Sequence, residues 1–308
     1  QHRIECNNLF LKTPNSTITN YYGMFFNNFS SFNSFHKNVR LKANFDNASV
    51  SLKDINFFAK VLGKIEHNTV KLNGRVSGPI SKLRGKNLQI NAGRRSVFKG
   101  DLSMSGLPNF EETFIVLEVD RIRTDYTDAK RIYPYINYPE NSKSLGRVSF
   151  SGEFVGFPGD FVADGEIQSD IGSIKSDINF KIDQKENISK YTGNFAAIDF
   201  DLGTWTAKPE LLGKVNLEVK IEGEGFKLED VNTKVDGEVK SFFIKNYNYE
   251  NIVVNGNFKD KLFSGELIIK DDNLDLDFSG TVDFEQEMLV MQFNASLENI
   301  DLKAKKHR

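Results

Sequence analysis

The sequence predicts an all-β fold, arranged as one elongated and curled antiparallel-rich sheet with an apolar concave groove and a few short helices. The first observation is strict alternation of apolar and polar residues, typical of a strand with one dry and one wet face. It is clearest in GKVNLEVKIEGEG, residues 213–225, where Val215, Leu217, Val219 and Ile221 alternate with charged or amide residues. The second is the recurrence of such stretches, separated by Gly, Asn and Asp. The third is the scarcity of segments with helical spacing.

The strand segments follow one another at short intervals. In chain order they are residues 38–52, 69–78, 87–93, 96–106, 113–119, 145–154, 160–168, 171–182, 190–200, 213–225, 231–244, 251–258, 263–270, 274–284 and 289–302. Counting further short pieces, we expect about twenty strands joined by hairpin-length turns. A weak Gly-containing repeat, as in GRVSG and GRVSFSG, indicates β units that bury their faces against their neighbours.

Helical segments are few and short. Phenylalanines at positions 25, 29, 32 and 35 have nearly helical spacing, which predicts a short amphipathic helix. Residues 55–62, 126–136 and 207–213 each have room for a turn or two, with Pro134 limiting the second segment and Pro209 starting the third. Helices of this length do not cover a sheet of this size.

An apolar sheet face must be buried against another layer. Without helices, the apolar face is buried against a second sheet, inside a closed barrel, or inside the same sheet curled along its length. A tightly curled sheet has an interior filled with side chains, whereas a loosely curled one has a hollow interior. Periodicity does not separate these cases. The hypothesis of a greasy groove for acyl chains rests on the dry-face residues, namely Val148, Phe150, Phe154, Ile178, Phe180, Ile182, Val215, Leu217, Val219, Ile221, Val235, Val239, Ile252, Val254, Phe258, Leu267, Ile269, Leu276, Phe278, Val282 and Phe284. A plain hydrophobic core is the alternative reading of the same residues.

The charge balance argues against a nucleic-acid-binding protein, and the cysteine count excludes internal disulfides. The chain has 40 Lys+Arg against 42 Asp+Glu, a formal net charge of -2, which argues against a dedicated nucleic-acid binder. The basic run KAKKHR at the end is typical of a solvated tail. The single cysteine, Cys6, has no partner for an internal disulfide, so disulfides do not hold the fold together.

No motif for catalysis, cofactor or metal binding is present. The four histidines lie outside metal-ligand spacing, and neither a nucleophile elbow nor a phosphate-binding glycine loop occurs. The acidic run KDDNLDLD, residues 270–277, lacks the glycine and distal Glu of an EF-hand. Carboxylate pairs such as Glu153 with Asp160, or Asp164 with Glu166, are expected by chance, and the one tryptophan, Trp205, gives little sign of a sugar platform. We therefore expect neither an enzyme, nor a cofactor, nor a metal site.

The chain has the character of a piece of a longer or processed polypeptide. It starts at Gln1 without an initiator Met or a signal-peptide pattern, and no stretch approaches the about 18 apolar residues of a membrane-spanning helix. We expect residues 1–308 to form a single continuous β-groove segment of a longer protein.

Two passages carry a family resemblance. Residues 68–126, beginning NTVKLNGRVSG, and residues 247–284, with FKDKLFSGEL followed by DDNLDLDFSGTVDF, resemble the repeat region of TamB proteins, in particular the version found in Bacteroidota. The resemblance extends from about residue 10 to residue 302, and its specificity comes from the extended match. TamB proteins belong to the wider AsmA-like group of bridge-like lipid carriers.

The resemblance implies a long taco-shaped sheet with an apolar concave side, and no catalytic residues. It implies a periplasmic segment of an inner-membrane-anchored, envelope-spanning protein, whose membrane anchor and carboxy-terminal domain lie outside this chain. The expected ligands are phospholipid acyl chains moving between the inner and outer membranes. The expected partner is an Omp85-family (TamA-like) outer-membrane protein, reached through regions outside this chain, with membrane contact through the missing termini and no nucleic acid.

A second function of a different class stays open. Unpaired N–H and C=O groups at an open groove edge would template a client strand, as in a scaffold or chaperone for outer-membrane β-barrel protein assembly with the Omp85 partner.

Overall fold

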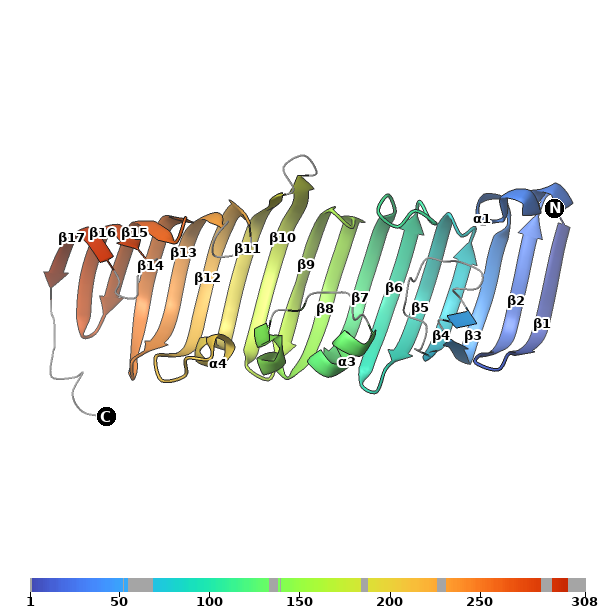
Figure 1. Cartoon of the computed structure of the whole chain (residues 1–308), viewed down its shortest axis with the longest axis horizontal. Helices are drawn as coiled ribbons and strands as arrows, with labels where there is room; N and C mark the ends of the chain where they lie inside the picture. Colours follow the sequence, from blue (N-terminus) through green and yellow to red (C-terminus); the bar gives the residue numbers. More distant parts are fainter. Residues whose placement is uncertain are drawn as a thin grey trace. The chain divides into compact units, whose positions relative to one another are not determined.

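The computed structural model of the chain describes residues 2–51, 53–54, 69–132, 138, 140–183, 188–225, 231–283 and 290–298. Over these residues the fold is all-β, as the sequence predicts. Seventeen described strands pair antiparallel and belong by their hydrogen bonding to one open sheet, with only short helices between them (Figure 1). The chain divides into two compact units, residues 1–161 and residues 162–308, and each is described by itself.

The first unit is a meander of eight strands. In order they are β1 (His2–Lys12), β2 (Thr17–Phe26), β3 (Arg40–Ser51), β4 (Thr69–Gly78), β5 (Lys82–Ala92), β6 (Ser96–Ser105), β7 (Phe114–Asp125) and β8 (Arg147–Phe157). Each strand pairs with the next one along the chain. Short helices lie in two of the connections: η1 (Phe29–Ser34) and α1 (Phe35–Asn38) before β3, and α3 (Tyr126–Ile132) and η2 (Glu140–Leu145) before β8.

The second unit repeats the same pattern. It contains β10 (Gly172–Asp183), β11 (Ile188–Asp201), β12 (Leu212–Glu224), β13 (Asn232–Ile244), β14 (Tyr247–Lys259), β15 (Leu262–Asp271), β16 (Leu274–Asp283) and β17 (Val290–Glu298), and these strands pair consecutively. Strand β9 (Asp160–Ser169) pairs with β10. The one helix described in the second unit is α4 (Leu202–Thr206), which lies between β11 and β12.

Two-residue turns set the register of hairpins in this unit. Lys245 and Asn246 between β13 and β14 have φ of 46° and 65°, and Asp260 and Lys261 between β14 and β15 have φ of 51° and 62°. Positive φ at both central residues is the geometry of a type I′ turn, whose twist matches that of the flanking strands. Each turn therefore fixes which residues face one another across the hairpin.

The core of the first unit follows one face of its strands. Ala43 opposes Val76, Leu102 opposes Leu117, and Leu117 opposes Phe154 of β8, so these side chains share a face. The most buried apolar side chains on these strands include Ala48, Leu88 and Val119, with at most 6% of their surface exposed. The alternation seen in the sequence thus becomes one dry face per strand.

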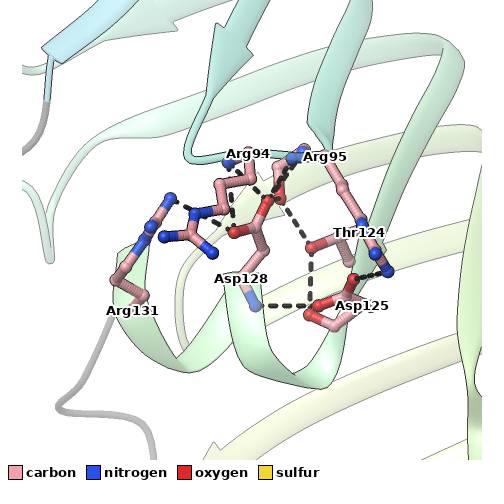
Figure 2. A network of polar contacts seen from close by, with 7 residues as sticks. Arg94, Arg95, Thr124, Asp125, Asp128 and Arg131 are labelled. Carbon is pink, nitrogen blue, oxygen red and sulfur yellow. Dashed lines mark hydrogen bonds and ion pairs between the residues drawn. The ribbon is translucent and has the colours of Figure 1, made fainter.

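A buried carboxylate attaches helix α3 to the turn between β5 and β6 (Figure 2). Asp128, with 3% of its surface exposed, accepts hydrogen bonds from the backbone N–H groups of Arg94 (2.8 Å), Arg95 and Ser96 (3.0 Å). Its carboxylate also forms an ion pair with Arg131, at 3.3 Å. Burial by itself raises the pKa of Asp128, but the N–H groups of Arg95 and Arg94 and the charge of Arg131 outweigh it and hold the pKa below its usual value.

The structure corrects several expected elements. Strands β1 and β2 lie in a region where the sequence analysis named no strand. The helix expected over residues 25–35 is a 3-10 turn and a single α-helical turn, beginning only at Phe29 because Asn28 caps it by accepting the N–H of Ser31.

The other three segments expected to be helical have different outcomes. Residues 126–132 form α3 as predicted, while residues 55–62 and 133–136 lie outside the described residues. Residues 207–213 do not start a helix at Pro209. The helix α4 precedes them, since Asp201 accepts the N–H of Thr204 at its start and Ala207 ends it with a left-handed φ of 56°.

Candidate functional site: an apolar sheet face

Strand β12 shows how the predicted alternation is expressed. Val215 and Val219 have only 4% and 8% of their surface exposed, and Leu217 and Ile221 are half-buried. The charged residues between and beside them, Lys214, Glu218, Lys220 and Glu222, are all exposed. One face of β12 is therefore dry and the other wet.

Cross-strand register extends this dry face over the neighbouring strands. Residues directly opposite one another in an antiparallel pair lie on the same face, with their side chains in contact range. Leu217 opposes Ala197 of β11 on one side and Val239 of β13 on the other. Val239 in turn opposes Ile252, and the same pairing continues through Ile269, Leu276 and Leu297. A row of apolar side chains thus crosses seven strands, β11 to β17.

Three more rows run beside the first one. The second contains Phe195, Val219, Gly237, Val254, Leu267, Phe278 and Ala295; the third contains Ile178, Gly193, Ile221, Val235, Gly256, Gly265, Gly280 and Phe293; the fourth contains Phe180, Tyr191, Gly223, Thr233, Phe258, Phe263 and Val282. We call these four rows, together with the residues that flank them on the same side of the strands, the apolar face of the second unit. From β11 to β17 the described side chains in these rows are apolar apart from Tyr191 and Thr233, whereas on β10 the second row continues with the polar Ser176, opposite Phe195.

Most of the sequence-predicted groove residues meet on this face. Ile182 and Val215 lie on it too, just beyond the four rows, in pairs with Ser189 and with Phe200 and Phe242. Val148, Phe150 and Phe154 belong to the first unit, where they share one face of β8. Phe284 lies outside the described residues.

The sequence reading omitted several members of the face. Phe195, Phe200, Phe242 and Phe263 belong to it by register. Two of them sit where the alternation breaks: Ala196 and Ala197 follow Phe195, and Phe242 has a second phenylalanine, Phe243, beside it. A register assignment would have found them, because each opposes a residue of the predicted set.

Glycine in the face makes room for aromatic rings. A Cβ atom placed on Gly256 would lie 2.5 Å from ring atoms of Phe263, the residue diagonal to it on β15. The ring therefore covers the backbone of Gly256, an arrangement known to protect glycine in sheets. Gly256 opposes Gly265, which opposes Gly280, so the third row has no side chains on three consecutive strands, β14 to β16.

A polar pair interrupts the fourth row. The hydroxyl groups of Tyr191 and Thr233 form a hydrogen bond, and both residues have only 8% of their surface exposed. They lie on β11 and β13, and the strand between them contributes Gly223 to the same row. The tyrosine reaches across β12 because Gly223 has no side chain to block it.

Helix α4 covers one end of the face. Trp205 packs against Phe200, with ring centroids 6.1 Å apart. Phe200 opposes Val215, and these two residues are 7% and 4% exposed. Since α4 is the one helix that the structure describes in residues 162–308, the central and distal rows have no helical cover there.

The opposite face of the sheet is polar and carries open hollows. One hollow, of about 760 Å³, is lined by charged, amide and hydroxyl side chains, including Lys220, Asp236, Asn255 and Glu266. A neighbouring hollow of about 440 Å³ combines charged residues such as Lys190 and Glu224 with Tyr191 and Gly223. The lining of the larger hollow suits water and polar groups rather than acyl chains, so the two faces of the unit differ in the ligands they accept.

The described residues contain no group of three or more His, Cys, Asp or Glu placed to hold a metal ion. None of the helices that the structure describes is long and apolar enough to cross a membrane.

Comparison with protein-family models, with curated proteins and with solved structures found no match to the chain.

Proposed function

We propose that the chain is a TamB-like periplasmic segment whose apolar face shelters phospholipid acyl chains during transport between the inner and outer membranes. The observation that supports this proposal is the register of four adjacent, largely apolar rows across β11–β17, with a described helix only at one end. A soluble protein rarely leaves so broad an apolar surface without a ligand or partner.

The physical basis is transfer of methylene groups from water to the apolar face. Each buried CH₂ contributes about 0.8 kcal/mol, so a chain of a dozen or so methylenes binds without any specific polar contact. The rows repeat from strand to strand with similar side chains, so neighbouring positions bind an acyl chain about equally well. Such a surface lets lipid slide along it, and direction and energy are supplied elsewhere.

The remaining parts of the proposal come from the resemblance to TamB proteins. They are an inner-membrane anchor and an Omp85-family partner, both outside this chain, with contact to membranes through those outer regions. The segment itself acts as a passive carrier without a catalytic residue, metal or cofactor.

A charge placed on the apolar face tests the proposal. Leu267 is half-buried in the second row, and its neighbour Glu266 is exposed on the polar face. In Leu267→Arg the long side chain can extend its guanidinium toward water, so the protein stays folded while acyl chains meet a charge. We expect a large loss of bound lipid, measured by mass spectrometry of lipid extracted from the purified chain.

The matched control is Glu266→Arg, which introduces the same side chain one residue away on the opposite face. It should keep the parent lipid content. Equal lipid content in the parent and in a folded Leu267→Arg variant would contradict the proposal, and an unfolded Leu267→Arg protein would indicate a packed core instead of a lipid surface.

One observation favours the second candidate function, a scaffold for outer-membrane β-barrel protein assembly. Strand β17 pairs with β16 within its unit, and its large apolar residues Val290, Phe293 and Leu297 are 45%, 50% and 53% exposed. An exposed apolar strand of this kind can accept a client strand by β-augmentation. Crosslinks from β17 to unfolded outer-membrane strands, without lipid on the apolar face, would favour this candidate.

A further inference from the structure

A cationic hollow lies at one end of strands β2 and β3 in the first unit. It has a volume of about 490 Å³. Its lining combines the aromatic residues Phe25 and Phe26, the cations Lys37 and Arg40, and several asparagine and serine side chains. Its charged lining residues are Lys37 and Arg40, and no carboxylate lines it. In a chain with a net charge of -2, this local excess of positive charge stands out.

The two cations are available to an outside anion. Lys37 and Arg40 are both exposed, and neither forms an ion pair within the described part of the chain. Lys42, also exposed, lies near this end with its Nζ 5.4 Å from the centroid of the Phe25 ring. The nearby Arg3, opposite Phe25 in the register, is already paired with Glu5 at 2.9 Å.

Phe26, which lines the hollow, belongs to an aromatic cluster. Phe26 and Phe32 have ring centroids 4.9 Å apart, and Phe29 packs on both of them, at 5.4 Å and 6.4 Å. His2 also stacks on Phe29 at 6.2 Å. Phe26 is only 2% exposed, yet Phe29 is 74% exposed. The cluster thus holds one phenylalanine ring out in solvent.

Cations, amide and hydroxyl donors, and an exposed apolar ring together match one chemical class, an anionic amphiphile with a phosphate group. Lys and Arg attract anionic headgroups, and an aromatic side chain at the boundary between headgroups and acyl chains adds apolar contact. A phosphate without an apolar part would leave the exposed Phe29 unexplained. A protein or nucleic-acid partner would require a broader contact area or a longer basic stripe.

We propose that this site, formed by η1, α1 and the ends of β2 and β3, binds the phosphate headgroup of anionic phospholipid at a membrane surface, with Phe29 inserted at the interface. The site is on a different unit from the apolar face of residues 162–308. It does not require that face to carry lipid, so each proposal can fail without the other.

Vesicle cosedimentation with the whole chain tests the proposal. Vesicles of equal parts phosphatidylglycerol and phosphatidylcholine should bind the chain, and pure phosphatidylcholine vesicles should bind it weakly. Each Lys or Arg near an anionic surface is worth about fivefold in partitioning, so Lys37→Ala with Arg40→Ala should weaken binding about 25-fold. Raising the salt concentration should weaken the parent and leave the double variant nearly unchanged.

Two controls separate the site from general surface effects. Lys71→Ala with Lys99→Ala removes the same charge from exposed positions on β4 and β6 and should leave binding within about twofold of the parent once long-range attraction is screened. Phe29→Ser should weaken binding about tenfold, whereas Phe10→Ser, at a position 69% exposed on β1, should not. Because these side chains are exposed, folding is preserved.

The competing outcomes are distinct. If inorganic phosphate, at a concentration equal to that of the anionic lipid, displaces the chain from the vesicles, the lipid assignment is overturned and a free-phosphate site is indicated. Equal losses in the cationic double variant and its control, or no binding to anionic vesicles by the parent, would also overturn it.

Discussion

Replacing the buried carboxylate of the first unit should destabilise that unit strongly. In Asp128→Asn one of the two carboxylate oxygens becomes an amide NH₂ group, which cannot accept a hydrogen bond. The backbone N–H groups of Arg94, Arg95 and Ser96 all donate to one carboxylate oxygen, Oδ2, so an amide oxygen in that position keeps them only as weaker, uncharged hydrogen bonds in a site that is 3% exposed. The new NH₂ group then takes the place of Oδ1, which accepts the N–H of Arg94 and pairs with Arg131.

The magnitude follows from these contacts. A hydrogen bond to a charged group contributes about 1.5–3 kcal/mol and one between neutral groups about 0.5–1.5 kcal/mol, so each of the three bonds loses about 1 kcal/mol. The ion pair with Arg131, whose side chain is 43% exposed, adds little. We expect the free energy of unfolding of the first unit to fall by about 3 kcal/mol.

Urea denaturation of the parent and variant, with hydrogen exchange at the amides of residues 94–96, measures this effect. The control is Asp201→Asn at the start of α4, where the carboxylate accepts the N–H of Thr204 at 2.9 Å. Asn caps helices about as well as Asp, so the control should cost only a few tenths of a kcal/mol. Equal stability of Asp128→Asn and the parent, or unprotected amides at residues 94–96 in the parent, would refute the reasoning.

Three further predictions concern packing and pH. The pKa of Asp128 is lower in the folded state than its unfolded value of about 4. The ionised carboxylate therefore stabilises the fold fully above about pH 4, and this stabilisation is lost as the pH falls through the folded pKa. The difference in unfolding free energy between the parent and Asp128→Asn should thus become smaller below about pH 4. Thr233→Val leaves the hydroxyl of Tyr191 without its partner in a buried site and should cost about 1–3 kcal/mol by urea denaturation, whereas Tyr191→Phe added to it should recover part of that loss. Val219→Arg, at a position 8% exposed, should lower the melting temperature far more than Leu267→Arg, and equal melting of the two variants would contradict the burial difference between them.

Alternation allowed much of the fold to be predicted from sequence. Strands such as β12 and β16 follow the period of two, so the dry residues Val219 and Phe278 could be placed on one face without a structure. Strands β1 and β2 were not predicted, because apolar and polar residues do not alternate in HRIECNNLFLK (β1) or in TITNYYGMFF (β2). There the pairing between the two strands and with β3 imposes the extended backbone.

The remaining site features depend on contacts between distant residues. Nothing in YTDAKRI, residues 126–132, marks Asp128 as a carboxylate that accepts three backbone N–H groups from the turn after β5. The pairing of Tyr191 with Thr233 across Gly223 likewise needs the register of three strands. The cationic site at Lys37 and Arg40 depends on where η1 and α1 turn the chain back toward β3.

Site-specific photocrosslinking in cells tests the lipid-sheltering claim most directly. Val254 lies in the second row of the apolar face, and the adjacent Asn255 lines the polar hollow on the opposite face. A photoreactive amino acid at position 254 should give a covalent adduct with the mass of a phospholipid, and the same group at position 255 should give none. Lipid adducts of equal yield at both positions, or no lipid adduct at position 254, would contradict the account.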